Sequence, residues 1–322
     1  MSKVSIALPI YNHEQYFAET LNSILGQTYQ DFEIVMIDDG STDESAKIAE
    51  TYAIQYPNKI RFIKQNNQGL EATVNRILSI TSGNFIAFTA SDDLWYPSKL
   101  DKQMEIFDKD FEERIGVVYT YGEHLNQDPM RTRGGDLTRG IRGKIFKELF
   151  VDGCFFIPCS IVIRKSALDK VGKFNHKYPY CSDYDILLRI AAAGYEFDFV
   201  PEILAIRRIH TCNMSSNQLK SNENNREMIL DIASRFKILI EQYNIDINFR
   251  LAKLDCELIR HYFSQGEMSR ARNVLFSLLR KYPSLVLRSK SNITYFVMSF
   301  FPNLVLSILK GFKPMAKLFK AK

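Results

Sequence analysis

The chain contains the stretch Glu33-Ile34-Val35-Met36-Ile37-Asp38-Asp39-Gly40-Ser41-Thr42-Asp43, in which an apolar run leads directly into two acids and a turn. A short apolar run bounded by turn residues is typical of a buried strand. Phe85-Ile86-Ala87-Phe88-Thr89 leads in the same way into Ala90-Ser91-Asp92-Asp93. Ligands of open α/β sheets bind beyond the carboxyl ends of the strands, so both acidic pairs are expected at one binding edge. Two such pairs suit a divalent metal ion and the hydroxyls or base of a nucleotide.

The segments around these two stretches alternate between strand and helix patterns. Apolar residues recur at helical spacing in the segment that contains Phe17, Leu21 and Ile24, whereas Val4 to Ile10 forms a continuous apolar run. This alternation predicts an α/β domain with a parallel sheet and helical crossovers. The expected strands are 4–10, 33–37, 60–63 and 85–89, and the expected helices are 14–26, 43–55 and 70–80.

The middle of the chain is less regular. Further strands are expected at 117–120, 160–164, 197–200 and 203–208, with helices at 166–171 and 183–193. Between them, residues 126–143 are rich in arginine and glycine and read as a loop. This loop either folds over a diphosphate or an anionic acceptor or is simply solvated; its basic residues are Arg131, Arg133, Arg139 and Arg142.

Composition limits the class of protein and divides the chain. The net charge of +5 in 322 residues does not by itself indicate a nucleic-acid partner. Five cysteines without CxxC spacing favour a reducing compartment, and the N-terminus enters a strand without a signal-peptide layout, so a cytoplasmic protein is expected. The composition changes beyond about residue 215, which predicts a catalytic domain over 1–215 and a helical region over 216–322. Within that region 261–282 resembles a helical hairpin with Gly266 in its turn.

The C-terminal segment has two readings. An apolar stretch, 293–309, is followed by five lysines without an acid. Pro302 and Asn303 argue against a membrane span, so 293–322 fits either an amphipathic helix on a membrane surface or a packed helix with a solvated tail. Attachment to the inner face of the cell membrane and a contact between copies of the chain are the roles considered for this region.

The acids fit one kind of chemistry. Transfer from a nucleoside diphosphate needs a cation that neutralises the leaving group and a carboxylate that removes a proton from the acceptor. Asp92 and Asp93 suit the metal and ribose, and Asp39 suits a base N–H. Asp183, at the start of a helix, is the best candidate for the remaining acid. Each acid also has a structural reading as loop or helix-cap chemistry.

Many ordered motifs over residues 3–215 resemble the family 2 glycosyltransferases. They include Pro9-Ile10-Tyr11-Asn12, Asp38-Asp39-Gly40-Ser41, Asn67-Gln68-Gly69, Asn75, Ser91-Asp92-Asp93, Ser182-Asp183-Tyr184-Asp185 and Arg208-Ile209-His210. The resemblance implies a GT-A fold, which is a Rossmann-like and mostly parallel sheet flanked by helices, here with a helical C-terminal extension. It also implies an inverting transfer of a sugar to a hydroxyl of a glycan or lipid-linked glycan in surface polysaccharide synthesis.

The resemblance assigns roles to individual residues. Asp183 would be the catalytic base, and Asp93 would hold Mn²⁺ or Mg²⁺ together with His210, which lies where relatives place a diphosphate or metal contact. The nucleotide-sugar site would contain Pro9, Tyr11, Asp39, Asn67, Gly69, Asn75 and Asp92. UDP is the default nucleotide because Asp39 suits the imide edge of uracil, although thymine presents the same edge.

Three departures from the family pattern leave alternatives open. Ala90 replaces an acid, Val74 replaces an arginine, and Ser182 replaces the acid before Asp183. A non-catalytic protein that binds nucleotide sugars or acts as a scaffold therefore competes with the enzyme. A phosphoacceptor domain would be much shorter, and a dinucleotide oxidoreductase is disfavoured because the first strand is not followed by G-x-G-x-x-G.

Overall fold

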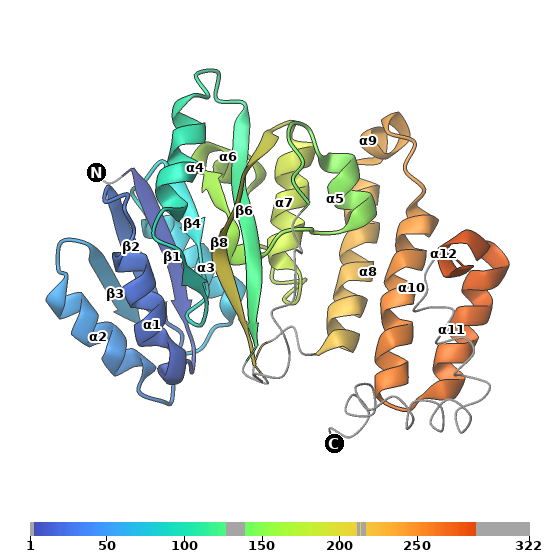
Figure 1. Ribbon diagram of the computed structural model, residues 1–322, viewed down its shortest axis with the longest axis horizontal. Helices are drawn as coiled ribbons and strands as arrows, with labels where there is room; N and C mark the ends of the chain where they lie inside the picture. The colour runs from blue at the N-terminus through green and yellow to red at the C-terminus, as the bar shows by residue number, and fades with distance from the viewer. Residues whose placement is uncertain (1–2, 127–138, 211–212, 214–216, 288–322) are drawn as a thin grey trace. The chain divides into compact units, whose positions relative to one another are not determined.

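The computed structural model describes residues 3–126, 139–210, 213 and 217–287 (Figure 1). The chain divides into two compact units, Met1–Asn213 and Met214–Lys322. The expected membrane-surface segment 293–322 lies outside the described residues, as do Arg131 and Arg133. No helix in the described part of the chain is long and apolar enough to cross a membrane.

The first unit is built on one mixed sheet of eight strands in the order β3-β2-β1-β4-β7-β6-β8-β5. Its first four strands pair in parallel, as the alternation predicts. They are β1 (Val4–Ile10), β2 (Phe32–Asp38), β3 (Ile60–Lys64) and β4 (Phe85–Phe88). The helices that connect them are α1 (Glu14–Leu25), α2 (Ser45–Gln55) and α3 (Leu70–Ile80).

The second half of the sheet contains antiparallel pairs. β7 runs antiparallel to both β4 and β6, and β5 runs antiparallel to β8. These strands are β5 (Leu94–Trp95), β6 (Ile115–Asn126), β7 (Val162–Arg164) and β8 (Glu196–Ile209). The associated helices are α4 (Lys99–Asp108), α5 (Phe146–Asp152), the 3₁₀ helix η1 (Pro158–Ser160), α6 (Lys165–Val171) and α7 (Ser182–Ala192).

Two expected strands, 197–200 and 203–208, are one strand, β8. Its pairing with β6 shifts register where Thr120 lies opposite Val200 and Tyr121 lies opposite Ile203. Pro201 lies in this irregular part of the strand, where its missing N–H removes no regular ladder bond. The expected strand 160–164 is also shorter, because Pro158 starts the 3₁₀ turn that precedes β7.

The core of the first unit explains why β1 and β2 are almost continuously apolar. Ile6, Leu8, Ile34 and Met36 are fully buried and belong to one cluster together with residues of α1 and α4. Strands of a parallel sheet that is covered on both faces are buried on both sides, so their sequences are nearly continuous apolar runs.

The described residues of the second unit, 217–287, form helices and the short connections between them. The helices are α8 (Gln218–Arg235), α9 (Lys237–Gln242), α10 (Ile247–Ser264), α11 (Met268–Lys281) and α12 (Pro283–Leu287). α10 and α11 form the expected hairpin, and Gly266 in its turn has a φ of +76°, which favours glycine. Ile259, Phe263 and Leu275 are among the buried residues that join these helices.

A buried lysine begins α4. Lys99 is fully buried, donates to Gln103 Oε1 at 3.0 Å and lies 4.0 Å from the centre of the Trp95 ring. Burial lowers the pKa of Lys99 from 10.5 to about 7. The unfolded chain therefore binds a proton between pH 7 and 10.5 that the folded chain does not bind, and Lys99 makes the protein more stable as the pH rises through this range.

We expect Lys99→Met to remove this part of the pH dependence. Between pH 7 and 9 the free energy of unfolding of the wild type should rise relative to the variant by about 1.4 kcal/mol per pH unit. Urea unfolding at pH 7, 8 and 9 measures this difference. A difference that is the same at all three pH values would contradict a neutral buried lysine.

Candidate functional site

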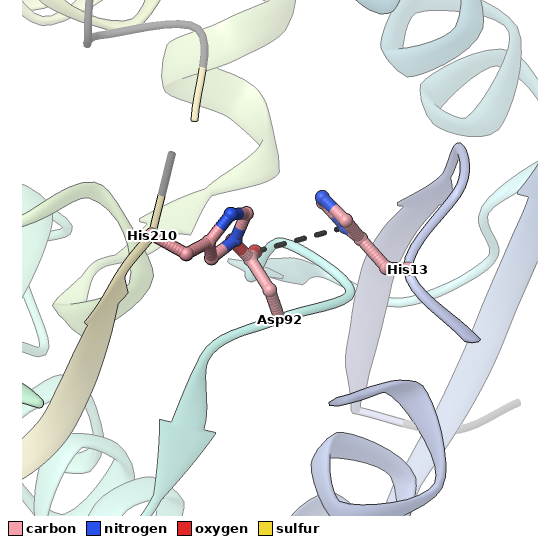
Figure 2. A group of neighbouring side chains, drawn as sticks. All are labelled: His13, Asp92 and His210. Atoms are coloured by element: carbon pink, nitrogen blue, oxygen red, sulfur yellow. Dashed lines mark hydrogen bonds and ion pairs between the residues drawn. The ribbon is translucent and has the colours of Figure 1, made fainter. Parts of the chain in front are cut away.

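The carboxyl ends of β1, β2, β4 and β8 lie at one edge of the sheet. This orientation follows from the parallel pairing of β1, β2 and β4, and from β8 running in the same direction as β6. His13, Asp92 and His210 follow β1, β4 and β8 and point toward one another at this edge (Figure 2). One potential ligand atom from each lies within 4.8 Å of the other two.

The turn after β1 fixes the position of His13. Asn12 has a φ of +53°, a conformation that asparagine tolerates better than most residues, and its Oδ1 accepts from the Thr42 N–H at 2.8 Å. The His13 N–H donates to Ser45 Oγ at 2.9 Å. The turn after β2 therefore holds the turn after β1, which places the His13 ring beside the residues that follow β4.

Asp92 is the centre of the three side chains. Its Oδ2 lies 2.9 Å from His210 Nε2 and accepts from Asn213 Nδ2 at 3.1 Å. Its Oδ1 lies 4.0 Å from His13 Nδ1, and the same ring nitrogen lies 2.7 Å from Ser91 Oγ. Asp92 and His210 are buried, and His13 is half-buried. Burial lowers the pKa of His13, which favours the neutral imidazole that metals bind.

These three residues fit a divalent cation. They offer two imidazoles and one carboxylate within the spread of a single coordination shell. The pattern resembles the two-histidine, one-carboxylate sets that hold transition-metal ions. Mg²⁺ prefers oxygen ligands and water, whereas imidazole ligands suit transition-metal ions.

Asp93 points to a different environment from Asp92. Its Oδ1 accepts from the Arg208 N–H at 3.0 Å, and its carboxyl group accepts from the Cys159 thiol. Burial, together with the charge of Asp92, raises the pKa of Asp93 to about 7. The structure therefore brings His210 to Asp92, and Asp93 is not one of the three neighbouring side chains.

Arg208 holds this acidic turn in place. Its Nε donates to the Asp92 carbonyl at 3.0 Å, and its Nη2 donates to Glu19 at 2.7 Å. The guanidinium also lies 4.7 Å from the centre of the Tyr16 ring, and Tyr16 stacks on His210 at a centroid distance of 5.0 Å. Arg208 and Tyr16 thus orient both Asp92 and His210.

Asp39 holds the loop that precedes α3. Its Oδ1 accepts from Gln65 Nε2 at 2.7 Å and from the Gln68 N–H at 2.8 Å, and its Oδ2 accepts from the Gly69 N–H at 2.9 Å. Gly69 has a φ of +88° and precedes the first residue of α3. Asn67 lies in the same loop, with its side chain exposed. Asp39 is buried, so these bonds stabilise its charge.

Pro9 and Tyr11 lie on the neighbouring strand end. Pro9 pairs with Ile37 of β2, but the pairing of β1 with β4 ends at Ala7 and Phe88, so the missing N–H removes no bond on that side. The Tyr11 side chain is 47% exposed, which leaves its ring available to a ligand. Both residues therefore lie at the edge where the family resemblance places the nucleoside.

Asn75 makes two hydrogen bonds to the backbone of one residue, Phe174. Its Nδ2 donates to the Phe174 carbonyl at 2.9 Å, and its Oδ1 accepts from the Phe174 N–H at 2.8 Å. The side chain predicted to contact the nucleotide sugar thus holds the segment that leads into α7.

Asp183 is the second residue of α7 and is half-buried. Its Oδ1 accepts from the Tyr184 N–H at 2.8 Å. Burial raises the pKa of Asp183, and the Tyr184 N–H and the charge of Arg207 partly oppose this effect. A raised pKa makes the carboxylate a stronger base than an ordinary aspartate, which suits proton removal.

The sequence did not single out several residues that complete this edge. These are His13, Gln65 and Glu71. Each lies beside or hydrogen-bonds to a residue that is distant in the chain: Asp92, Asp39 and Ser182, respectively. His13 had one signal, its position in a strand-end turn on the same edge as Asp92. Gln65 and Glu71 had none that local periodicity provides.

The comparisons with known proteins agree with this arrangement. The family model described as glycosyl transferase family 2 matches residues 5–172. The chain is 41% identical over 244 residues to the putative glycosyltransferase EpsE of Bacillus subtilis, and the match covers 75% of this chain and 85% of that protein.

Two solved structures share the fold. One is TarS 1–349 of S. aureus in complex with UDP-GlcNAc, with a TM-score of 0.60 and 19% identity over 86% of this chain and 81% of that one. The other is a mannosyltransferase from Pyrobaculum calidifontis in complex with GDP-Man and Mn²⁺, with a TM-score of 0.58 and 15% identity over 93% and 84% of the two chains. These likenesses confirm the GT-A fold, with its mixed sheet and flanking helices. From the family match and the relative together, the chain belongs to glycosyl transferase family 2 and is a glycosyltransferase.

Proposed function

We propose that this enzyme transfers a sugar, with inversion, from a nucleoside-diphosphate sugar to a hydroxyl of a glycan or lipid-linked glycan in surface polysaccharide synthesis. The observation that carries the proposal is the group of His13, Asp92 and His210 at the strand edge, where the loop held by Asp39 also lies. A cation site beside a nucleotide loop is what departure of a diphosphate requires.

The donor is assigned to the edge formed by β1, β2 and the loop before α3. Tyr11 offers an exposed ring to the base. Of the about four lone-pair sites of the Asp39 carboxylate, Gln65, Gln68 and Gly69 use three, which leaves one for an imide N–H. UDP is our first choice of nucleotide, because TarS binds UDP-GlcNAc in the same fold. A thymine nucleotide presents the same edge and is the second choice.

The cation is assigned to Asp92, His210 and His13, with Mn²⁺ preferred over Mg²⁺. The related fold that binds GDP-Man together with Mn²⁺ supports this choice, as do the two imidazole ligands. When bound there, the cation neutralises charge on the diphosphate of the donor. Asp93, which the family resemblance places on the metal, lies next to this group in the chain.

Asp183 is assigned as the base. As the acceptor oxygen forms its bond to the anomeric carbon, the bond from that carbon to the diphosphate oxygen breaks. The nucleoside diphosphate leaves with the electron pair, and Asp183 takes the proton of the acceptor hydroxyl. Attack from the face opposite to the leaving group inverts the configuration of the anomeric carbon.

A thermal-shift screen tests donor and metal together. UDP-GlcNAc, UDP-glucose, dTDP-glucose and GDP-mannose are added singly, each with Mn²⁺ or with Mg²⁺. A ligand that binds only the folded protein raises the midpoint, by an amount set by its concentration relative to Kd. We expect a uridine nucleotide sugar with Mn²⁺ to give the largest rise. Equal midpoints with and without every ligand would contradict the proposed donor site.

A further inference from the structure

Helix α3 contacts the segment that carries Asp183 at two points. Asn75 makes both of its bonds to the backbone N–H and C=O of Phe174, which lies before α7. One turn earlier on the same helix, Glu71 Oε1 accepts from Ser182 Oγ at 2.9 Å. Ser182 immediately precedes Asp183, so the second contact acts on the peptide that leads into the proposed base.

The bond between Glu71 and Ser182 is a buried one. The two residues are only 5% and 6% exposed, although Glu71 carries an ionisable group. Burial raises the pKa of Glu71; its own N–H and the Ser182 hydroxyl oppose this effect, whereas the charge of Asp183 adds to it. Burying a carboxyl group beside another acid costs free energy, and the hydrogen bonds from the Ser182 hydroxyl and from its own N–H offset that cost, so Glu71 adds little net stability to the fold.

Ser182 is also one of the three departures from the family pattern. A hydroxyl stands where an acid usually precedes the base, and Glu71 brings a carboxyl group to the same place from α3. In this chain the carboxyl group beside the residue before Asp183 therefore comes from Glu71 of helix α3, not from position 182 itself.

Glu71 also lies close in the chain to the loop before α3, residues 65–69, which Asp39 holds and which is the proposed nucleotide loop. Gly69, whose N–H donates to Asp39, is separated from Glu71 by one residue. Three hydrogen bonds to Asp39 hold the loop, and the loop starts the helix that holds Ser182. Asp39 and Asp183 are thus joined by a short series of hydrogen bonds and peptide units.

We propose that Glu71 is a positioning residue, which sets the orientation of Asp183 through Ser182 and ties it to the loop that binds the nucleotide. The inference rests on the proposed function, because it assigns Asp183 as the base. Glu71 does not act on the substrate itself. Its loss should therefore slow the chemical step and leave donor binding unchanged.

The test compares Glu71→Ala, Glu71→Gln, Ser182→Ala and the double variant Glu71→Ala/Ser182→Ala. Release of the nucleoside diphosphate is followed with the most active donor of the panel above, in the presence of Mn²⁺. We expect kcat to fall by about tenfold to a hundredfold in both alanine variants, with KM for the donor within about twofold of wild type. Because both changes break one contact, the double variant should be no slower than the slower single variant. Glu71→Gln keeps an acceptor for the hydroxyl and should lose less than Glu71→Ala.

A rescue variant separates positioning from general loss of structure. Glu71→Ala/Ser182→Glu moves the carboxyl group from α3 onto α7 and should recover most of the lost kcat. Wild-type kcat in both alanine variants, multiplying losses in the double variant, or no rescue would overturn the role of Glu71. Those results leave an active wild type and so spare the proposed function, whereas a wild type without turnover on any donor would contradict both.

Discussion

Replacing Asp183 by asparagine should reduce sugar transfer by at least about a hundredfold while nucleotide binding stays at the wild-type level. A positioned general base contributes about 10²–10⁴-fold to a rate, and an amide cannot take the proton of the acceptor. Asparagine preserves the shape of the side chain and can still accept from the Tyr184 N–H. The measurement pairs the release of nucleoside diphosphate with calorimetric titration of UDP in the presence of Mn²⁺.

Asp169→Asn is the matched control for this variant. Asp169 is an exposed acid on α6, so the same change of charge and shape should leave the rate unchanged. The pH profile gives a second readout. Burial raises the pKa of Asp183, and the base must be ionised, so wild-type kcat should fall on the acid side at a higher pH than an ordinary aspartate would give. An Asp183→Asn variant with the wild-type kcat would contradict the assignment of Asp183 as the base.

Replacing Asp92 by asparagine should weaken Mn²⁺ binding by at least about a hundredfold. The carboxylate is the negatively charged member of the group and lies 2.9 Å from His210 and 4.0 Å from His13. His13→Ala and His210→Ala should each weaken binding by about tenfold or more, because each removes one ligand. Electron paramagnetic resonance of free Mn²⁺, in the presence of UDP, measures these affinities independently of turnover.

Two variants sharpen this measurement. His261→Ala removes a histidine from α10 in the second unit and should leave Mn²⁺ affinity unchanged. Asp93→Asn tests whether Asp93 is a metal ligand, as the family resemblance implies. In the structure Asp93 instead accepts hydrogen bonds from the Arg208 N–H and the Cys159 thiol. If Asp93→Asn abolished binding while His13→Ala preserved it, the group formed by His13, Asp92 and His210 would not be the cation site.

The parallel half of the fold was predictable because its signals are local. Each strand is a short apolar run that ends in turn residues, and each helix carries its own periodicity. The strand order was not predicted: the connections from β1 to β2 and from β2 to β3 join neighbouring strands, but β4 pairs with β1 on the other side of the sheet. β7 was harder to orient, because the direction in which a strand joins the sheet depends on the path of the preceding segment and not on its own residues. The break that Pro158 introduces before β7 shows the same dependence.

The sequence predicted where the site lies, at the carboxyl ends of the strands, but not which side chains contact one another there. Asp39, Asp92 and His210 could be placed because each follows a strand. Whether His210 meets Asp92 or Asp93 depends on which way each side chain of an adjacent pair turns, and Arg208 decides this through the Asp93 carboxylate and the Asp92 carbonyl. Glu71 and Ser182 are 111 residues apart, and no local pattern connects them.

A comparison of wild type and Asp183→Asn in one set of assays tests most directly whether this protein is an enzyme with Asp183 as its base. We predict that both bind UDP with Mn²⁺ equally well and that only the wild type releases nucleoside diphosphate from its donor at an appreciable rate. A wild type that binds the donor without turning it over, as a scaffold would, or an Asp183→Asn variant that transfers sugar at the wild-type rate, would contradict the account.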